Sequence, residues 1–171
     1  MNRDPLVDPV RHALNSAHAH FAIGHAPARR YPPDVAPLAV IDDMSEPTLT
    51  RLQELLTPSE LVYIFNEPPG QMDELSVGPP LHTFQMLAPE PPPAVESHKG
   101  EINPILMTSD DAGEMFELIT LAFPEFYQPR TYEIGTYYGI RVDGKLVAMA
   151  GERLCMAGYR EISGVCTIRV M

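Results

Sequence analysis

The chain has 171 residues, 44% of them hydrophobic, which suffices for one ordinary domain or two small ones with a packed core. Its net charge of -11 repels phosphate backbones and no basic residues cluster, so we expect no nucleic-acid partner. No apolar run reaches the about 20 residues of a membrane-spanning helix, and no secretory signal begins the chain, so we expect a cytoplasmic protein without membrane contact.

Proline clusters divide the sequence, which contains 19 prolines. Each proline removes a backbone donor and fixes φ, so such clusters lie outside central strands and helix interiors. The run Pro89–Pro93 and its polar neighbours predict a linker over 89–100. We therefore predict a small α/β region over 1–88 and a second domain over 101–171.

The first half has the pattern of a small α/β unit with no catalytic constellation. Leucines at helical spacing predict a helix that Thr57-Pro58 ends, because the residue before proline avoids the helical region. The predicted elements are a helix over 12–21, a compact apolar run at 38–41, a helix over 46–56, a buried strand over 61–65 and another strand over 81–87.

The second half predicts a strand, one helix and an antiparallel meander. Thr108 and the residues after it supply capping oxygens and first-turn carboxylates for the helix, which Phe123-Pro124 ends. Asp143-Gly144 and Ala157-Gly158 are turn signals. The helix is expected to bury Met115, Leu118, Ile119 and Ala122, and the strands are expected over 102–107, 137–142, 145–154 and 159–167.

Two segments of this half resemble GNAT-type N-acetyltransferases of the FR47-like branch: Gly139-Ile-Arg-Val-Asp-Gly-Lys-Leu-Val-Ala-Met-Ala-Gly-Glu-Arg153 and Glu161-Ile-Ser-Gly-Val-Cys-Thr167. With the capped helix, the resemblance covers residues 102–167. It implies an α/β fold of the α+β type with an incomplete GNAT-like mixed sheet. It also implies transfer of an acetyl group from acetyl-CoA, as co-substrate, to a primary amine of a small molecule or peptide.

The resemblance assigns roles to residues of the last predicted strand. In the family, acetyl-CoA lies beside this strand and its pantetheine amides bond the strand backbone, which assigns these contacts to Val165, Cys166 and Thr167. An unpaired strand edge suits such an extended amide ligand on physical grounds as well. Strand alternation places Val165 and Thr167 on the same face as Ser163 and Glu161.

Two carboxylates are candidate general bases. Glu161 is the stronger, since many family members carry a glutamate at the start of this strand that removes a proton from the attacking amine. Glu152, on the preceding predicted strand, is the weaker candidate. The alternatives are a solvent-facing carboxylate for Glu161 and an ion pair with Arg153 or Arg160 for Glu152.

One family motif is missing from the sequence. The Arg/Gln-x-x-Gly-x-Gly/Ala loop, which binds the pyrophosphate of the cofactor at a helix N-terminus, occurs nowhere. We therefore expect a chain truncated before this loop, with weak or no binding of acetyl-CoA and with weak activity or none. The alternative is a non-catalytic remnant or interaction module. The exposed edge of the last strand also predicts poor solubility.

The histidines and cysteines are the remaining residues to consider, as metal ligands or as a disulfide pair. We predict no metal site, because no Asp, Glu or Cys is arranged beside the N-terminal histidines, which are His12, His18, His20 and His25. Cys155 and Cys166 lie on neighbouring predicted strands, where they are small buried hydrophobes or, as the alternative, a disulfide pair.

Overall fold

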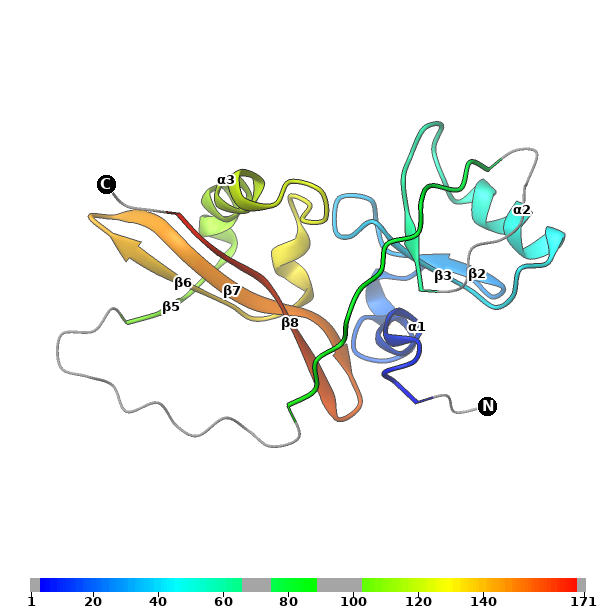
Figure 1. The fold of residues 1–171 in the computed structure, drawn as a ribbon, viewed down its shortest axis with the longest axis horizontal. Coiled ribbons are helices and arrows are strands. Elements are labelled where there is room, and N and C mark those ends of the chain that lie inside the picture. Colours follow the sequence, from blue (N-terminus) through cyan, green and yellow to red (C-terminus); the bar gives the residue numbers. More distant parts are fainter. Residues whose placement is uncertain (1–3, 66–74, 89–102, 169–171) are drawn as a thin grey trace.

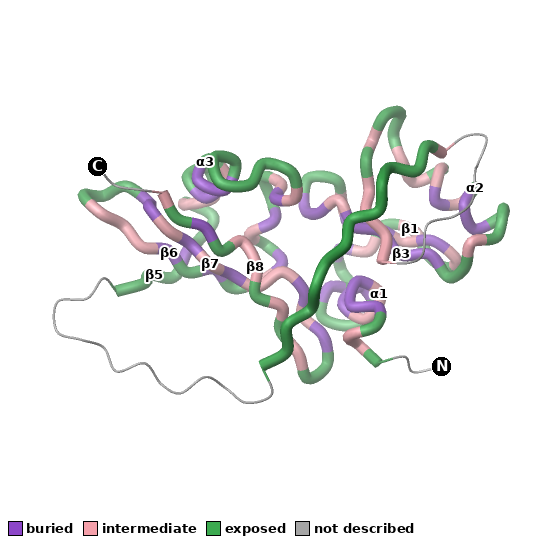
Figure 2. Tube along the Cα trace, viewed as in Figure 1, coloured by how far each residue is buried: buried purple, intermediate pink, exposed green. Residues whose placement is uncertain are grey.

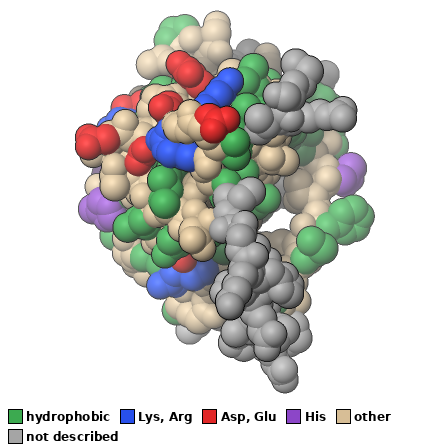
Figure 3. Space-filling view, turned by 90° about the vertical axis from the view of Figure 1, so that its left-hand side faces the viewer, with side chains coloured by type: hydrophobic (Ala, Val, Ile, Leu, Met, Phe, Trp, Pro, Cys, Tyr) green, Lys and Arg blue, Asp and Glu red, His purple; other side chains and the backbone are tan. Residues whose placement is uncertain are grey.

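The computed structural model describes residues 4–65, 75–88 and 103–168, which form an α+β fold with two four-stranded sheets (Figure 1). The first sheet has the order β1-β2-β3-β4 and the second the order β5-β6-β7-β8. Figure 3 shows acidic and basic side chains next to one another on one face of the molecule. Among the described residues, no helix is long and apolar enough to cross a membrane.

The elements have the following bounds. The N-terminal elements are α1 (Pro9–Leu14), η1 (Ala19–Phe21), β1 (Ile23–His25), β2 (Ala28–Arg30), β3 (Leu38–Ile41), α2 (Glu46–Glu54) and β4 (Tyr63–Ile64). The C-terminal elements are β5 (Ile105–Leu106), η2 (Ser109–Asp111), α3 (Ala112–Ala122), η3 (Thr131–Ile134), β6 (Tyr137–Val142), β7 (Lys145–Met156) and β8 (Tyr159–Thr167).

The first sheet is mixed: β1, β2 and β3 are antiparallel, and β4 runs parallel to β3. The predicted helix over 46–56 is confirmed as α2, whose Leu49 and Leu52 pack on the sheet. The helix predicted over 12–21 is displaced, because Asp8 accepts a hydrogen bond from the Arg11 N–H at 3.2 Å and Pro9 fits the first turn. Only a 3-10 turn remains at 19–21.

Two strand predictions in this half need correction. The segment over 61–65 contains only the short strand β4, half-buried, and Leu61 is exposed. The strand predicted over 81–87 is wrong, since the segment has no regular structure and Phe84 and Met86 are 96% and 95% exposed. Strand preference is largely the packing of a side chain on a pleated surface, and no described strand pairs with this segment.

The second sheet is the predicted antiparallel meander, with β6 and β8 at the expected bounds and β7 extending to Met156. Its strand β5 covers only Ile105–Leu106 of the predicted range, and residue 102 lies outside the described residues. Helix α3 covers one face of the sheet through Met115, Leu118 and Ile119. Ala122 is exposed, contrary to the prediction, because the last turn of α3 reaches beyond this cluster.

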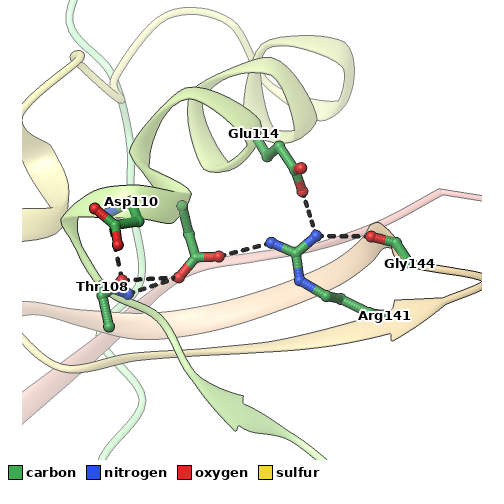
Figure 4. Close-up of polar contacts among 6 residues, drawn as sticks. Thr108, Asp110, Glu114, Arg141 and Gly144 are labelled. Atoms are coloured by element: carbon green, nitrogen blue, oxygen red, sulfur yellow. Dashed lines mark hydrogen bonds and ion pairs between the residues drawn. The ribbon is translucent and has the colours of Figure 1, made fainter.

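Arg141 fastens the N-terminus of α3 to the β6–β7 hairpin (Figure 4). Its guanidinium contacts Asp111 Oδ1 at 2.6 Å, Glu114 Oε2 at 2.5 Å and the Gly144 carbonyl at 2.8 Å. Asp111 also accepts the Thr108 N–H at 2.9 Å, which completes the predicted cap. These contacts fix α3 on one face of the second sheet.

A buried cluster joins the two halves of the chain. Its members are Val10, Ala13, Leu14, Phe21, Tyr31, Val35, Ala36, Leu38, Val40, Ile134, Leu154 and Met156. Polar contacts add to it: Arg130 N–H donates to the Asp34 carbonyl at 2.8 Å and Thr131 Oγ1 to the Val35 carbonyl at 2.7 Å. The division into domains at 89–100 stays a prediction.

Candidate functional site

The candidate site is the outer edge of β8, which pairs only with β7 among the described strands. Ile168 N–H donates to the Val147 carbonyl at 2.8 Å. Main-chain groups of successive residues in an antiparallel strand point alternately toward and away from the partner. The N–H and C=O of Thr167 therefore face away from β7, where an extended ligand can bond them.

A β-bulge interrupts β8 beside this edge. Met149 lies opposite Cys166 and Gly151 opposite Ser163, so Gly164 and Val165 together face Ala150. Gly164 has a φ of 61°, in the left-handed region that favours glycine. Gly164 is not among the predicted site residues, although a glycine inside a strand pattern is a signal for a bulge.

The bulge changes which side chains share a face. Ile162 is 64% and Val165 70% exposed, whereas Cys166 is buried. The single face predicted for Glu161, Ser163, Val165 and Thr167 is therefore interrupted at Gly164. Alternation holds only while the pairing register is unbroken, and the register depends on β7 as well as on β8.

An apolar hollow of about 460 Å³ lies against this part of the sheet. All three residues predicted to contact the cofactor line it. The complete lining is Pro104, Tyr138, Ile140, Ala148, Met149, Ala150, Val165, Cys166 and Thr167. None of these side chains is charged, so the hollow suits an uncharged, partly apolar ligand that bonds the main chain of β8.

Glu161 lies outside the lining and is paired with Arg153. Arg153 Nε donates to Glu161 Oε2 at 3.1 Å, and Arg153 Nη2 donates to Oε1. The pair forms where β7 bulges, with Arg153 and Leu154 opposite Glu161. Nearby, burial raises the pKa of Tyr137 above its ordinary value, with Glu161 adding to the increase and Arg153 opposing it. The Tyr137 phenol therefore stays protonated.

Glu152 is held by structural contacts. Its Oε2 accepts the Thr136 N–H at 3.1 Å, and its Oε1 lies 3.8 Å from Arg160 Nε. This is the ion pair with Arg160 that the sequence offered as the alternative. The structure does not bring Glu152 to the hollow, since it is absent from the lining.

The N-terminal histidines and Cys155 are absent from the lining of the hollow, whereas Cys166 belongs to it. His18 is buried with its Nδ1 2.8 Å from the Tyr31 hydroxyl, and His20 packs on Phe21. In the described ranges, no three His, Cys, Asp or Glu side chains converge as metal ligands. Both cysteines are free; Cys155 lies opposite Arg160 and Cys166 opposite Met149, so they are not cross-strand neighbours.

A solved structure has a fold similar to that of this chain. A candidate acetyltransferase from the GNAT family of Novosphingobium aromaticivorans superposes with a TM-score of 0.67 at 24% identity, over 96% of this chain and 71% of that one. The fold of this chain is GNAT-like. No protein-family model and no curated protein matches the sequence.

Proposed function

We propose that this chain has the function of a GNAT-type N-acetyltransferase of the FR47-like branch, transferring an acetyl group from acetyl-CoA to a primary amine. The observation that carries the proposal is the open edge of β8, where Val165, Cys166 and Thr167 line one apolar hollow. Pantetheine is an extended chain with two amides. It suits main-chain pairing at a strand edge combined with an uncharged cavity.

In the proposed reaction, the neutral amine attacks the thioester carbonyl carbon. The C–N bond forms, the C–S bond breaks, the thiolate of CoA leaves and the amine proton passes to Glu161, directly or through water. Glu161 accepts this proton only after it exchanges one of its two bonds to Arg153. We propose Arg153 as the residue that holds the carboxylate in position until the amine arrives.

The lining of the hollow predicts which part of the cofactor supplies affinity. No lining side chain is cationic, and Arg153, outside the lining, is paired with Glu161. We expect weak binding of acetyl-CoA, with little contribution from its diphosphate. In calorimetric titrations, S-acetylpantetheine should therefore bind within about fivefold of acetyl-CoA, corresponding to about 1 kcal/mol. A preference for acetyl-CoA of a hundredfold or more would contradict this assignment.

Gly164 tests the position of the ligand. Gly164→Ala places a side chain in the left-handed region and a Cβ 3.1 Å from the Tyr137 ring, which distorts the bulge. We expect binding of S-acetylpantetheine to weaken at least tenfold. The matched control is Gly158→Ala, which has the same backbone strain at φ 82° but no neighbour within 4 Å. Equal binding by both variants would place the ligand elsewhere.

Glu161 tests the chemistry. Glu161→Gln keeps the shape and one acceptor for Arg153 but cannot take a proton, so we expect the transfer rate to fall by about 10²-fold with unchanged ligand affinity. The control is Glu152→Gln, which alters the ion pair with Arg160 and should keep most of the activity. Equal rates for wild type and Glu161→Gln would remove Glu161 from the mechanism.

A second candidate is the interaction module. It is favoured by the exposed apolar side chains along the same edge, Ile162 and Val165. This alternative predicts no transfer to any amine and no binding of S-acetylpantetheine, together with capture of an extended peptide along β8.

A further inference from the structure

The segment 76–88 is extended, exposed and rich in apolar residues, and it is drawn as a continuous green tube in Figure 2. It contains no Asp, Glu, Lys or Arg in a chain of net charge -11. Phe84 and Met86 are almost fully exposed, as are large parts of Val77, Leu81 and Leu87. No hydrogen bond between two described residues involves 76–88. This is an unfavourable arrangement for so apolar a segment in water.

The second sheet has a surface complementary to this segment. The edge of β8 leaves main-chain groups such as those of Thr167 without a strand partner among the described residues. The adjoining hollow is uncharged and apolar, with Tyr138 50% and Val165 70% exposed. The pattern of Leu81–Leu87 is that of a strand, with Phe84 and Met86 on the same face. If this segment were added as a strand, it would hydrogen-bond the main-chain groups at the edge of β8 and bury its apolar side chains.

The same chain can supply this strand. Residues 89–104 connect the segment to β5 and can span up to about 50 Å when extended. Tethering gives the segment a high effective concentration at the sheet. A second copy would instead bring two molecules of net charge -11 together, which repel each other.

We propose that Leu81–Leu87 docks in its own chain as an added strand on the outer edge of β8, with Phe84 and Met86 entering the apolar hollow. The open arrangement in Figure 1 and this docked arrangement then exchange. The docked segment covers the main-chain groups that the proposed function gives to pantetheine, so it restricts access to them. The docking itself does not depend on the proposed function.

Hydrogen exchange on the wild-type chain tests docking without any cofactor. In the variant Phe84→Asp/Met86→Asp, docking would bury two charges in the apolar hollow, which is unfavourable. Because Phe84 and Met86 are exposed in the open arrangement, the same substitutions should not destabilise that arrangement. We expect the Thr167 amide to exchange at least tenfold faster in this variant than in the wild type. The matched control, Thr83→Asp/Gln85→Asp, alters the opposite face of the segment and should stay much closer to the wild type.

Three results would overturn the proposal. Equal Thr167 exchange in wild type and in Phe84→Asp/Met86→Asp would show that the segment does not cover β8. An equally large acceleration in the control variant would remove the role of the Phe84 and Met86 face. Protection that increases with protein concentration, together with dimers in sedimentation, would assign the strand to a second copy. If the docking proposal is right and the proposed acetyl transfer is wrong, the Thr167 amide of the wild type stays protected, and S-acetylpantetheine binds neither the wild type nor Phe84→Asp/Met86→Asp.

Discussion

At the scale of single residues, the imidazole of His18 is a buried polar group beside the cluster that joins the two halves. Its Nδ1 lies 2.8 Å from the Tyr31 hydroxyl, and its ring contacts Phe21 edge-on. Burial lowers the pKa of His18, and the neighbouring His20 lowers it further. The folded chain therefore favours the neutral ring, whereas the unfolded chain binds a proton near the ordinary pKa of about 6.5.

This difference predicts a loss of stability in acid. The contribution of neutral His18 is complete above pH about 6.5 and is lost progressively as the pH falls below it, because the unfolded state then binds more protons. Urea unfolding at pH 7.5 and 5.5 should show a smaller decrease in the free energy of unfolding for His18→Gln than for wild type. The control is His25→Gln at an exposed position. An identical decrease in His18→Gln and wild type would contradict the prediction.

At the scale of elements, Arg141 links α3 to the β6–β7 hairpin (Figure 4). The Thr108 N–H and the Arg141 guanidinium hold the pKa of Asp111 below its usual range. Because the pair is partly exposed, we expect Arg141→Met to lower the free energy of unfolding by only about 1 kcal/mol. Arg51→Met, which removes a helical pair with Glu54, should cost less than about 0.5 kcal/mol. Equal losses of unfolding free energy in the two variants, measured by urea unfolding, would mean that the Arg141 contacts stabilise the fold no more than an ordinary surface ion pair.

Some helices and strands of this chain could be predicted from the sequence and others could not. β6 and β8 have the expected bounds because Asp143, Gly144 and Gly158 adopt the positive φ values that their turn signals imply. Segment 81–87 has an equally good strand pattern but no described partner, and a partner is not encoded locally. The cofactor contacts on β8 followed from the resemblance and stay a prediction. The Glu161–Arg153 pair could not be predicted, because it depends on a register shift between β7 and β8. The hollow could not be predicted either, because residues far apart in the sequence, from Pro104 to Thr167, line it together.

At the scale of the whole molecule, one buried cluster contains residues of both halves. Leu154 of β7 is fully buried in it beside residues such as Leu14 and Tyr31. Leu154→Ala should lower the free energy of unfolding by about 2–5 kcal/mol. Because the cluster is shared, we expect one transition, observed alike by far-ultraviolet circular dichroism and tyrosine fluorescence.

The control for this prediction is Leu146→Ala, buried in the cluster of the second sheet alone. It should shift the same single transition. Two separate transitions, of which each variant moves only one, would contradict a shared core. They would support the predicted independent domains over 1–88 and 101–171.

Under the proposed function, the outer edge of β8 binds an acyl-pantetheine arm through its main chain. Titration of the ¹⁵N-labelled chain with S-acetylpantetheine tests it most directly. We predict the largest amide shift at Thr167, whose N–H faces away from β7, with a smaller shift at Cys166, whose main-chain groups face β7, and little change in β1–β4. Saturating shifts centred on the first sheet, with β8 unchanged, would contradict the claim.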